Sequence, residues 1–327
     1  MKLFFVTDLH GSEMCYRKFL NALKIYKVDV GIMAGDMTGK FIVPIIEQPD
    51  GTYFCEFLGQ KMVIKDKKKL KELEWRIASV GSYYYYTTPE EFEQLKAEGK
   101  TIEGRIDEKK RKIVLLKGRI EELFVKLVCE RLEHWLQLAE ERLKGTGIRV
   151  YMCPGNDDIY EIDEVLEKST FVIPTNERKV EIDGHEMISL AASNPTPWDT
   201  PREFPEEVLA EKIEALASQI DNMETAIFNF HVPPYGTLLD EAPKLSEDLV
   251  PSVEETIHAG STAVLEAIKK YQPLLGLHGH IHESRAIQKI GRTVCVNPGS
   301  EYTEGILRGV ILILDKKKVK SYLFTSG

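Results

Sequence analysis

Long apolar runs are absent from this sequence of 327 residues, and this absence argues against a membrane protein. No run approaches the roughly 18 apolar residues that a membrane-spanning helix needs. The first apolar run, Met1–Val6, is interrupted by Asp8 and His10, whereas a secretory signal needs about 7–15 apolar residues and a cleavage site. We therefore expect a β-strand there, no membrane association and a cytoplasmic protein.

Closely spaced cysteine pairs are also missing. The five cysteines are scattered, without a Cys-x-x-Cys pair, at positions 15, 55, 129, 153 and 295. An odd and scattered set argues against a disulfide framework and against a structural zinc knuckle. We expect these side chains to be reduced and buried.

An excess of basic residues is missing as well. The chain has 43 Lys and Arg against 52 Asp and Glu, and its net charge is −9. Nucleic-acid binders need a basic face, because much of their affinity comes from neutralising phosphates. The composition therefore disfavours a nucleic-acid partner. A small phosphorylated substrate is compatible with this charge.

What the sequence does contain is a series of short apolar runs, bounded by Gly or Pro, of the kind that forms buried strands. Between the first two runs, residues 15–27 have the apolar spacing of a crossover helix. In α/β sheets the functional groups collect beyond the carboxyl ends of the strands. Residues that can bind metal ions follow these runs: Asp8 and His10, Asp36, Asn156, His231, and His280 with His282.

The segment between two of these runs has a different pattern. A Pro-Asp-Gly turn at 49–51 predicts a hairpin, and residues 107–144 have the spacing of a long amphipathic helix. We expect one domain over 1–327, with a core of 1–40 and 146–327 and a hairpin-plus-helical insertion at 41–145. The insertion is predicted to be a lid or an assembly surface, removable without loss of metal binding. A homo-oligomer would form through its helices.

The candidate ligands are imidazoles, carboxylates and one amide oxygen. Nitrogen and oxygen ligands without thiolate suit divalent Mn, Fe, Zn or Ni. Seven ligands are too many for one tetrahedral ion. They suffice for two ions about 3.5–4 Å apart if one carboxylate bridges them. The sequence therefore predicts a site for two divalent metal ions.

The order of these residues resembles that of the calcineurin-like metallophosphoesterase superfamily. The resemblance covers almost the whole chain outside the insertion. It implies an α/β fold of two stacked mixed β-sheets flanked by helices, with the metal site at the strand ends. Its five blocks are Asp8-Leu9-His10, Gly35-Asp36, Gly155-Asn156-Asp157-Asp158, His231 and Gly279-His280-Ile281-His282.

The resemblance also implies a role for each ligand and an activity. Asp8, His10 and His282 would hold the first ion, and Asp36 would bridge the two ions. The second ion would be held by Asn156, His231 and His280. A hydroxide activated by both ions would hydrolyse a phosphodiester or a phosphomonoester, with small diesters favoured. The chain would then be a hydrolase acting on ester bonds.

One residue departs from the family pattern. Asp157 stands where the family commonly has a histidine that protonates the leaving group. A carboxylate near two cations should have a depressed pKa and be a poor proton donor. Asp157 either changes the catalysis or only caps its loop, in which case a group such as His258 would supply the proton. We expect Asp158 to accept a hydrogen bond from a ligand histidine.

Two other functions remain open at this point. One is a nuclease for DNA or RNA, resembling repair nucleases of the same superfamily, which would need a basic groove. The other is a scaffold that keeps the fold and uses the pocket to bind proteins. Superfamily members of this second kind have degraded ligand sets, whereas this chain has all seven ligand positions. The intact set favours an enzyme.

Overall fold

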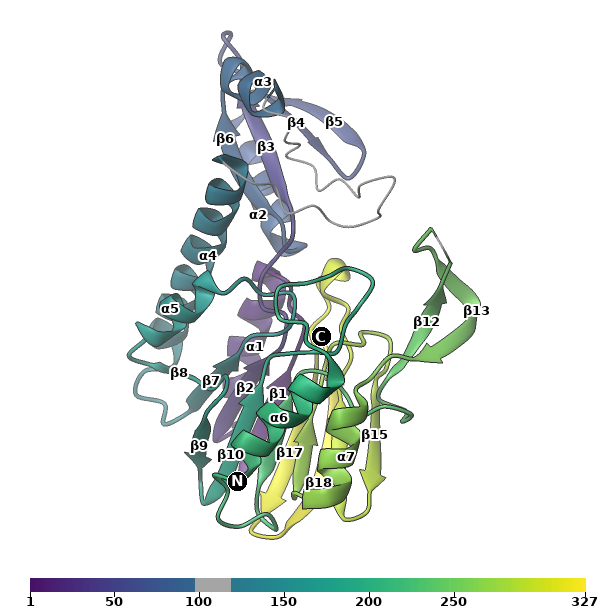
Figure 1. Cartoon of the computed structure of the whole chain (residues 1–327). Coiled ribbons are helices and arrows are strands. Elements are labelled where there is room, and N and C mark those ends of the chain that lie inside the picture. The colour runs from purple at the N-terminus through teal and green to yellow at the C-terminus, as the bar shows by residue number, and fades with distance from the viewer. Residues whose placement is uncertain (98–118, 247) are drawn as a thin grey trace.

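Two six-stranded mixed β-sheets lie face to face and carry helices on their outer faces (Figure 1). The computed structural model describes residues 1–97, 119–246 and 248–327. The strand order is β18-β17-β1-β2-β7-β8 in the first sheet and β15-β16-β14-β11-β10-β9 in the second. This architecture confirms the predicted sandwich of stacked sheets.

The strands of the two sheets come from both ends of the chain. The first sheet comprises β1 (Lys2–Val6), β2 (Val30–Ala34), β7 (Arg149–Cys153), β8 (Val172–Pro174), β17 (Arg308–Asp315) and β18 (Lys318–Ser326). The second sheet comprises β9 (Lys179–Ile182), β10 (His185–Leu190), β11 (Ile227–Phe230), β14 (Leu275–Leu277), β15 (Ala286–Ile290) and β16 (Thr293–Asn297).

Strand β1 shows why the apolar runs are continuous. Successive side chains of a strand point to opposite faces of its sheet. Leu3 and Phe5 belong to the core between the two sheets, and Phe4 and Val6 belong to the core under the outer helices. Strands β1, β2 and β7 are parallel neighbours, and strands buried on both faces need apolar residues at every position.

Helices cover the outer face of each sheet. The first sheet packs against α1 (Glu13–Ile25), α4 (Arg119–Leu143) and α5 (Glu161–Glu167). The second packs against α6 (Glu206–Ala217) and α7 (Thr262–Tyr271). Ser12 and Ser261 cap α1 and α7, because their hydroxyl oxygens accept hydrogen bonds from backbone N–H groups of the first turn. Among the described residues, no helix is long and apolar enough to cross a membrane.

The insertion forms a small four-stranded sheet of its own, at the top of Figure 1, with strand order β5-β4-β3-β6. The pairing of β3 with β4 confirms the predicted hairpin. The predicted helix over 107–144 is present from Arg119 onward, and its first part lies outside the described residues. The elements are β3 (Ile42–Glu47), β4 (Tyr53–Phe57), β5 (Gln60–Ile64), α2 (Lys67–Ser79), β6 (Tyr83–Thr87) and α3 (Pro89–Ala97).

The second half of α4 packs into the main core. The ring of Trp135 stacks on that of Tyr16 with centroids 4.1 Å apart, and the indole N–H donates to Glu13 Oε2 at 2.7 Å. Buried side chains from Val128 onward join the cluster built around α1. This part of the predicted insertion therefore stabilises the main domain, and its apolar stripe is core.

The root of the insertion, by which we mean the residues around Gly39, Gly81 and Arg131, contacts the backbone that carries His10. Gly39 N–H donates to the Tyr83 hydroxyl at 2.8 Å, and Arg131 Nη1 donates to the carbonyl of Gly11 at 2.9 Å. A Cβ atom built on Gly81 would lie 1.9 Å from the His10 carbonyl oxygen, and one built on Gly39 would lie 1.7 Å from that of Gly81. The expectation that the insertion can be removed with metal binding largely intact stays a prediction, and this packing predicts instead that the removal disturbs the loop of His10.

We expect Gly81→Ala to destabilise the protein by about 3 kcal/mol or more. The new side chain would have an unfavourable positive φ, and its Cβ would also overlap the His10 carbonyl. Gly59→Ala is the matched control. Both glycines have positive φ, +85° and +72°, but nothing lies within 4 Å of a Cβ at position 59. The control should therefore cost only about 1 kcal/mol. Chemical denaturation measures both, and equal losses would contradict a close-packed root.

Candidate metal centre

Seven side chains that can bind metal ions meet at one edge of the sandwich. Because β1, β2 and β7 run parallel, their carboxyl ends lie at the same edge of the first sheet. The parallel strands β11 and β14 end similarly in the second sheet. The loops after these strands carry all the predicted ligands, namely Asp8, His10, Asp36, Asn156, His231, His280 and His282.

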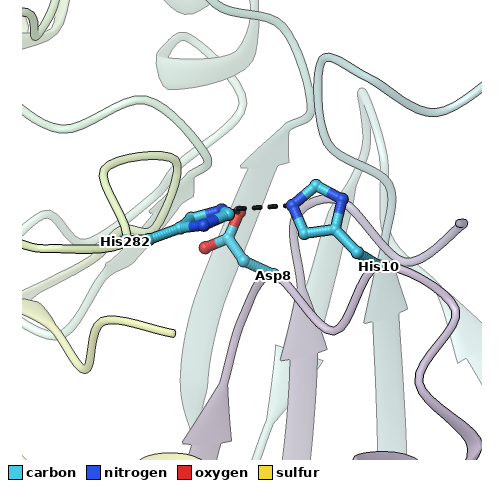
Figure 2. Close-up of side chains that lie close together, drawn as sticks. All are labelled: Asp8, His10 and His282. Carbon is cyan, nitrogen blue, oxygen red and sulfur yellow. Dashed lines mark hydrogen bonds and ion pairs between the residues drawn. The ribbon is translucent and has the colours of Figure 1, made fainter. Parts of the chain in front are cut away.

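The first cluster contains Asp8, His10 and His282 (Figure 2). The Nε2 atoms of the two histidines lie 3.1 Å apart, and His282 Nε2 lies 3.6 Å from Asp8 Oδ1. Asp8 and His10 come from the loop after β1, and His282 comes from the loop after β14. These are the three residues that the family resemblance assigns to one ion.

The second cluster contains Asp36, His231 and His280. His231 Nε2 lies 3.5 Å from Asp36 Oδ1. Asn156 joins the cluster because its Oδ1 lies 2.8 Å from His280 Nδ1. The amide nitrogen of Asn156 donates to the Thr200 hydroxyl at 2.7 Å, which fixes the side-chain oxygen toward the cluster.

Asp36 lies between the two clusters. Its Oδ2 is 3.7 Å from His10 Nε2, and its Oδ1 is 3.5 Å from His231 Nε2. Each oxygen of one carboxylate thus faces a histidine of a different cluster. This is the arrangement that a bridging carboxylate needs.

Buried polar atoms in the centre fit bound cations. Among the described residues, Asp8 Oδ1 and His231 Nε2 are buried without a hydrogen-bond partner, and they lie 3.8 Å apart. An unsatisfied buried polar atom costs about 1–3 kcal/mol. Two atoms that bind the same ion at about 2.1 Å from each lie about 3–4 Å apart. This is the spacing within each cluster, 3.6 Å from His282 Nε2 to Asp8 Oδ1 and 3.5 Å from His231 Nε2 to Asp36 Oδ1. One ion in each cluster would satisfy both unpartnered atoms, so the residues present fit divalent metals.

The backbone of the ligand loops is strained. Four ligands adopt positive φ values: Asp8 (54°), His10 (41°), Asp36 (21°) and His280 (68°). Such conformations are uncommon for residues other than glycine and cost about 1–3 kcal/mol each. They persist only where the surroundings over-determine them, and they cluster at functional sites.

Burial and mutual charges set the protonation of the centre. Burial raises the pKa of Asp8, but the nearby rings of His282 and His231 outweigh it and lower this pKa to about 2. Burial lowers the pKa of His231, but the nearby carboxylate of Asp36 outweighs it and raises this pKa to about 9. Burial lowers the pKa of His280 to about 4. Without a cation, the ionised carboxylates of the centre thus keep a proton on His231, and a metal ion would have to displace that proton, because a histidine ligand must be neutral.

Asp158 does not accept a hydrogen bond from a ligand histidine, which corrects the expectation from the sequence. Its carboxylate is fully buried, and its partners in the described part of the chain are the N–H groups of Met37 (2.9 Å), Thr38 (2.8 Å) and Gly155 (2.8 Å) and the Thr38 hydroxyl (2.6 Å). Asp158 therefore joins the loop of Asp36 to the loop of Asn156. It holds the backbone of both ligand loops in place.

Asp157 forms an ion pair with Lys40, and its Oδ2 lies 3.9 Å from His10 Nδ1. The lowered pKa that the sequence suggests depends on bound cations. In the chain alone, burial raises the pKa of Asp157 to about 6, although the Lys40 ammonium lowers it. Lys40 was missed from the sequence, and its only signal is its place four residues after Asp36.

His258 faces the same cavity as the metal ligands and is held by a buried carboxylate. Its Nδ1 lies 2.9 Å from Asp240 Oδ1, and the side chain of Asp240 is 0% exposed while that of His258 is 41% exposed. Asp240 itself accepts hydrogen bonds from the N–H groups of Thr237 (2.8 Å) and Gly260 (3.0 Å). Asp240 was also missed, because nothing local in the sequence links it to position 258.

A cavity of about 540 Å³ opens above the metal ligands. One wall is the loop 194–200, and the other is a hairpin of β12 (Glu241–Leu245) and β13 (Pro251–His258) that projects from the body (Figure 1). This hairpin was not predicted, since its sequence is acidic and rich in proline.

Comparison with known proteins agrees with the fold. No family model matches the chain. The uncharacterized protein MJ1162 of Methanocaldococcus jannaschii is 29% identical over 180 residues, which cover 53% of this chain and 76% of that protein. TT1561 of Thermus thermophilus aligns with a TM-score of 0.51 and 14% identity over 100% of this chain and 97% of its own.

YfcE, a phosphoesterase from E. coli, aligns over 99% of this chain and 98% of its own with a TM-score of 0.33 and 12% identity. At 14% identity TT1561 bears on the fold alone, and the TM-score of YfcE is too low to bear on either fold or function. The residues add what the alignments cannot, because the five ligand blocks occur in family order and meet in two joined clusters. In its stacked-sheet fold and in the order of its ligand motifs, the chain therefore resembles the calcineurin-like metallophosphoesterase superfamily.

Proposed function

We propose that this protein is a metal-dependent phosphoesterase that hydrolyses a small phosphodiester with the help of two divalent ions. One observation carries the proposal: two clusters of nitrogen and oxygen ligands share Asp36 at the base of a cavity. A non-catalytic scaffold would have no need of strained ligand loops or of unsatisfied buried atoms at their centre.

The seven ligands would hold the ions as the family resemblance implies. Asp8, His10 and His282 would bind one ion, Asn156, His231 and His280 the other, and Asp36 both. Bound divalent ions supply a nucleophile from water at neutral pH and neutralise the phosphoryl oxygens. Mn, Fe, Zn and Ni all suit this ligand set.

Lys40 would orient the phosphate. Among the described residues that line the cavity, it is the one Lys or Arg side chain. Its ion pair with Asp157 fixes the ammonium beside His10 and Asp36. A positioned ammonium donates charge-assisted hydrogen bonds to phosphate oxygens. Asp157 would then act through Lys40, and not as a proton donor.

His258 would protonate the leaving group in place of the histidine that the family has at position 157. The hydrogen bond with Asp240 orients the ring through Nδ1, which leaves Nε2 for the substrate. A carboxylate on one ring nitrogen is the usual way to fix a histidine for acid–base work. Near neutral pH a histidine can carry the proton that an alkoxide leaving group needs.

Metal analysis tests the shared ligand. Wild-type protein saturated with Mn²⁺ and freed of excess ion should retain two ions per chain. Asp36→Asn should lose both ions or nearly all turnover of bis(p-nitrophenyl) phosphate, because the shared carboxylate contacts both clusters. Asn156→Ala should chiefly weaken one ion, since it faces one cluster. Elemental analysis measures the metal content.

Asp221→Asn is the control, because the Asp221 side chain is 90% exposed and pairs with Lys179, which is not a ligand. It should keep both ions and full activity. One ion or none in saturated wild-type protein would contradict the dinuclear site.

A leaving-group series tests His258. With a range of aryl and alkyl phosphodiesters, log kcat should depend only weakly on leaving-group pKa in the wild type. His258→Gln should make this dependence steep, with a loss of about 10²–10⁴-fold for alkyl esters and little change for p-nitrophenyl esters. The reason is that only a poor leaving group needs the proton.

His134→Gln serves as the matched control. His134 is also about half exposed and faces a carboxylate, Glu13 Oε1 at 3.6 Å, but it lies on α4. It should leave the slope unchanged. A steep slope in the wild type, reduced by Asp157→His, would instead indicate that the chain lacks a general acid and that the departure at position 157 is the cause.

A further inference from the structure

Large apolar side chains line both walls of the cavity beside a few polar ones, although its base is made of metal ligands. The loop 194–200 contributes Pro195, Pro197 and Trp198, and the β12–β13 hairpin contributes Leu245, Leu249 and Ile257. Trp198 is 42% exposed and Ile257 is 46% exposed. Large apolar side chains are thus open to solvent on both sides of a charged centre.

Hydrogen bonds build the first wall into a fixed shape. Glu203 accepts from the N–H of Thr196 at 2.8 Å and from that of Thr200 at 2.8 Å, and both threonine hydroxyls also donate to it. The backbone N–H of Trp198 donates to the Thr196 hydroxyl at 3.2 Å. The loop therefore fixes the backbone that carries this tryptophan at the wall of the cavity.

On the second wall, one ion pair of the hairpin lies away from the cavity. Lys244 and Glu255 pair with each other at 2.6 Å on the hairpin, and neither lines the cavity. The hairpin is anchored at its base, where the Ser284 hydroxyl donates to the Glu241 carbonyl at 2.7 Å. A hairpin with this ion pair turned aside and with Leu245, Leu249 and Ile257 at the cavity suits an apolar ligand group.

We propose that the substrate is a phosphodiester with one apolar ester group, which binds between Trp198 and the β12–β13 hairpin while its phosphate lies at the metal centre. This inference rests on the proposed phosphoesterase function. A volume of about 540 Å³ suits a small molecule. A polynucleotide would need several cations along its path, and the described lining offers Lys40 alone.

The test keeps the leaving group constant and varies the other ester group. Metal-loaded protein is assayed with p-nitrophenyl methyl, butyl, octyl and phenyl phosphates. We expect kcat/KM to rise by about fourfold per methylene that enters the cavity. A larger gain for octyl than for phenyl identifies an alkyl chain as the natural group, and the reverse identifies an aromatic ring.

A matched pair of variants locates the effect. Trp198→Ser should reduce the octyl-to-methyl ratio of kcat/KM by about tenfold. Trp75→Ser should leave the ratio unchanged, because Trp75 is equally exposed, at 42%, but lies on α2 in the insertion. In parallel, octylphosphonate, which cannot be hydrolysed, should change the tryptophan fluorescence of wild type and Trp75→Ser but not of Trp198→Ser.

The two proposals fail in different ways. No hydrolysis of any ester would overturn the phosphoesterase function, whereas the fluorescence titration would still report the apolar site. Hydrolysis that is independent of the ester group, with an unchanged ratio in Trp198→Ser, would overturn the apolar substrate and leave the phosphoesterase intact. Stronger competition by a single-stranded oligonucleotide than by octylphosphonate would overturn it in favour of nucleic acid.

Discussion

The buried carboxylate of Asp158 joins the loops from which the metal centre is assembled. It accepts four hydrogen bonds, three from the segment that follows Asp36 and one from Gly155 beside Asn156. Hydrogen bonds to a charged acceptor are about twice as strong as neutral ones, and burial strengthens them further. These bonds offset the strained backbone of Asp36. The neighbouring Arg202 donates to the Asp158 carbonyl at 2.8 Å and steadies the same turn.

The two adjacent carboxylates, Asp157 and Asp158, have different contacts in this arrangement. Asp158 points away from the cavity and organises backbone, whereas Asp157 lines the cavity and pairs with Lys40. A histidine at position 157 would act on the substrate directly. The acidic residue instead pairs with Lys40, just before the insertion. In the proposed mechanism, the charge that meets the phosphate would thus come from the loop after β2, and the proton donor would come from β13.

The ligand set could be predicted because each ligand directly follows a short apolar strand, and parallel strands end at one edge of a sheet. The partners of Lys40 and His258 could not, since each contact joins segments that no periodicity relates. The sequence identified Asp158 as an acceptor but gave the wrong donor, because its donors are mainly backbone N–H groups. The spacing in α4 predicted a buried stripe, but it could not tell that Trp135 packs on α1.

The contact between Gly39 and Gly81 bears on how this architecture could be recombined. A Cβ at either position would collide with the other segment or with the His10 carbonyl, so the two glycines and the loop of His10 are shape-matched. To graft the small sheet onto another sandwich of this kind, one would have to transfer this chain's loop of His10 together with it. The unit that has to be moved is therefore larger than the inserted segment, and it includes one of the loops that carry the metal ligands.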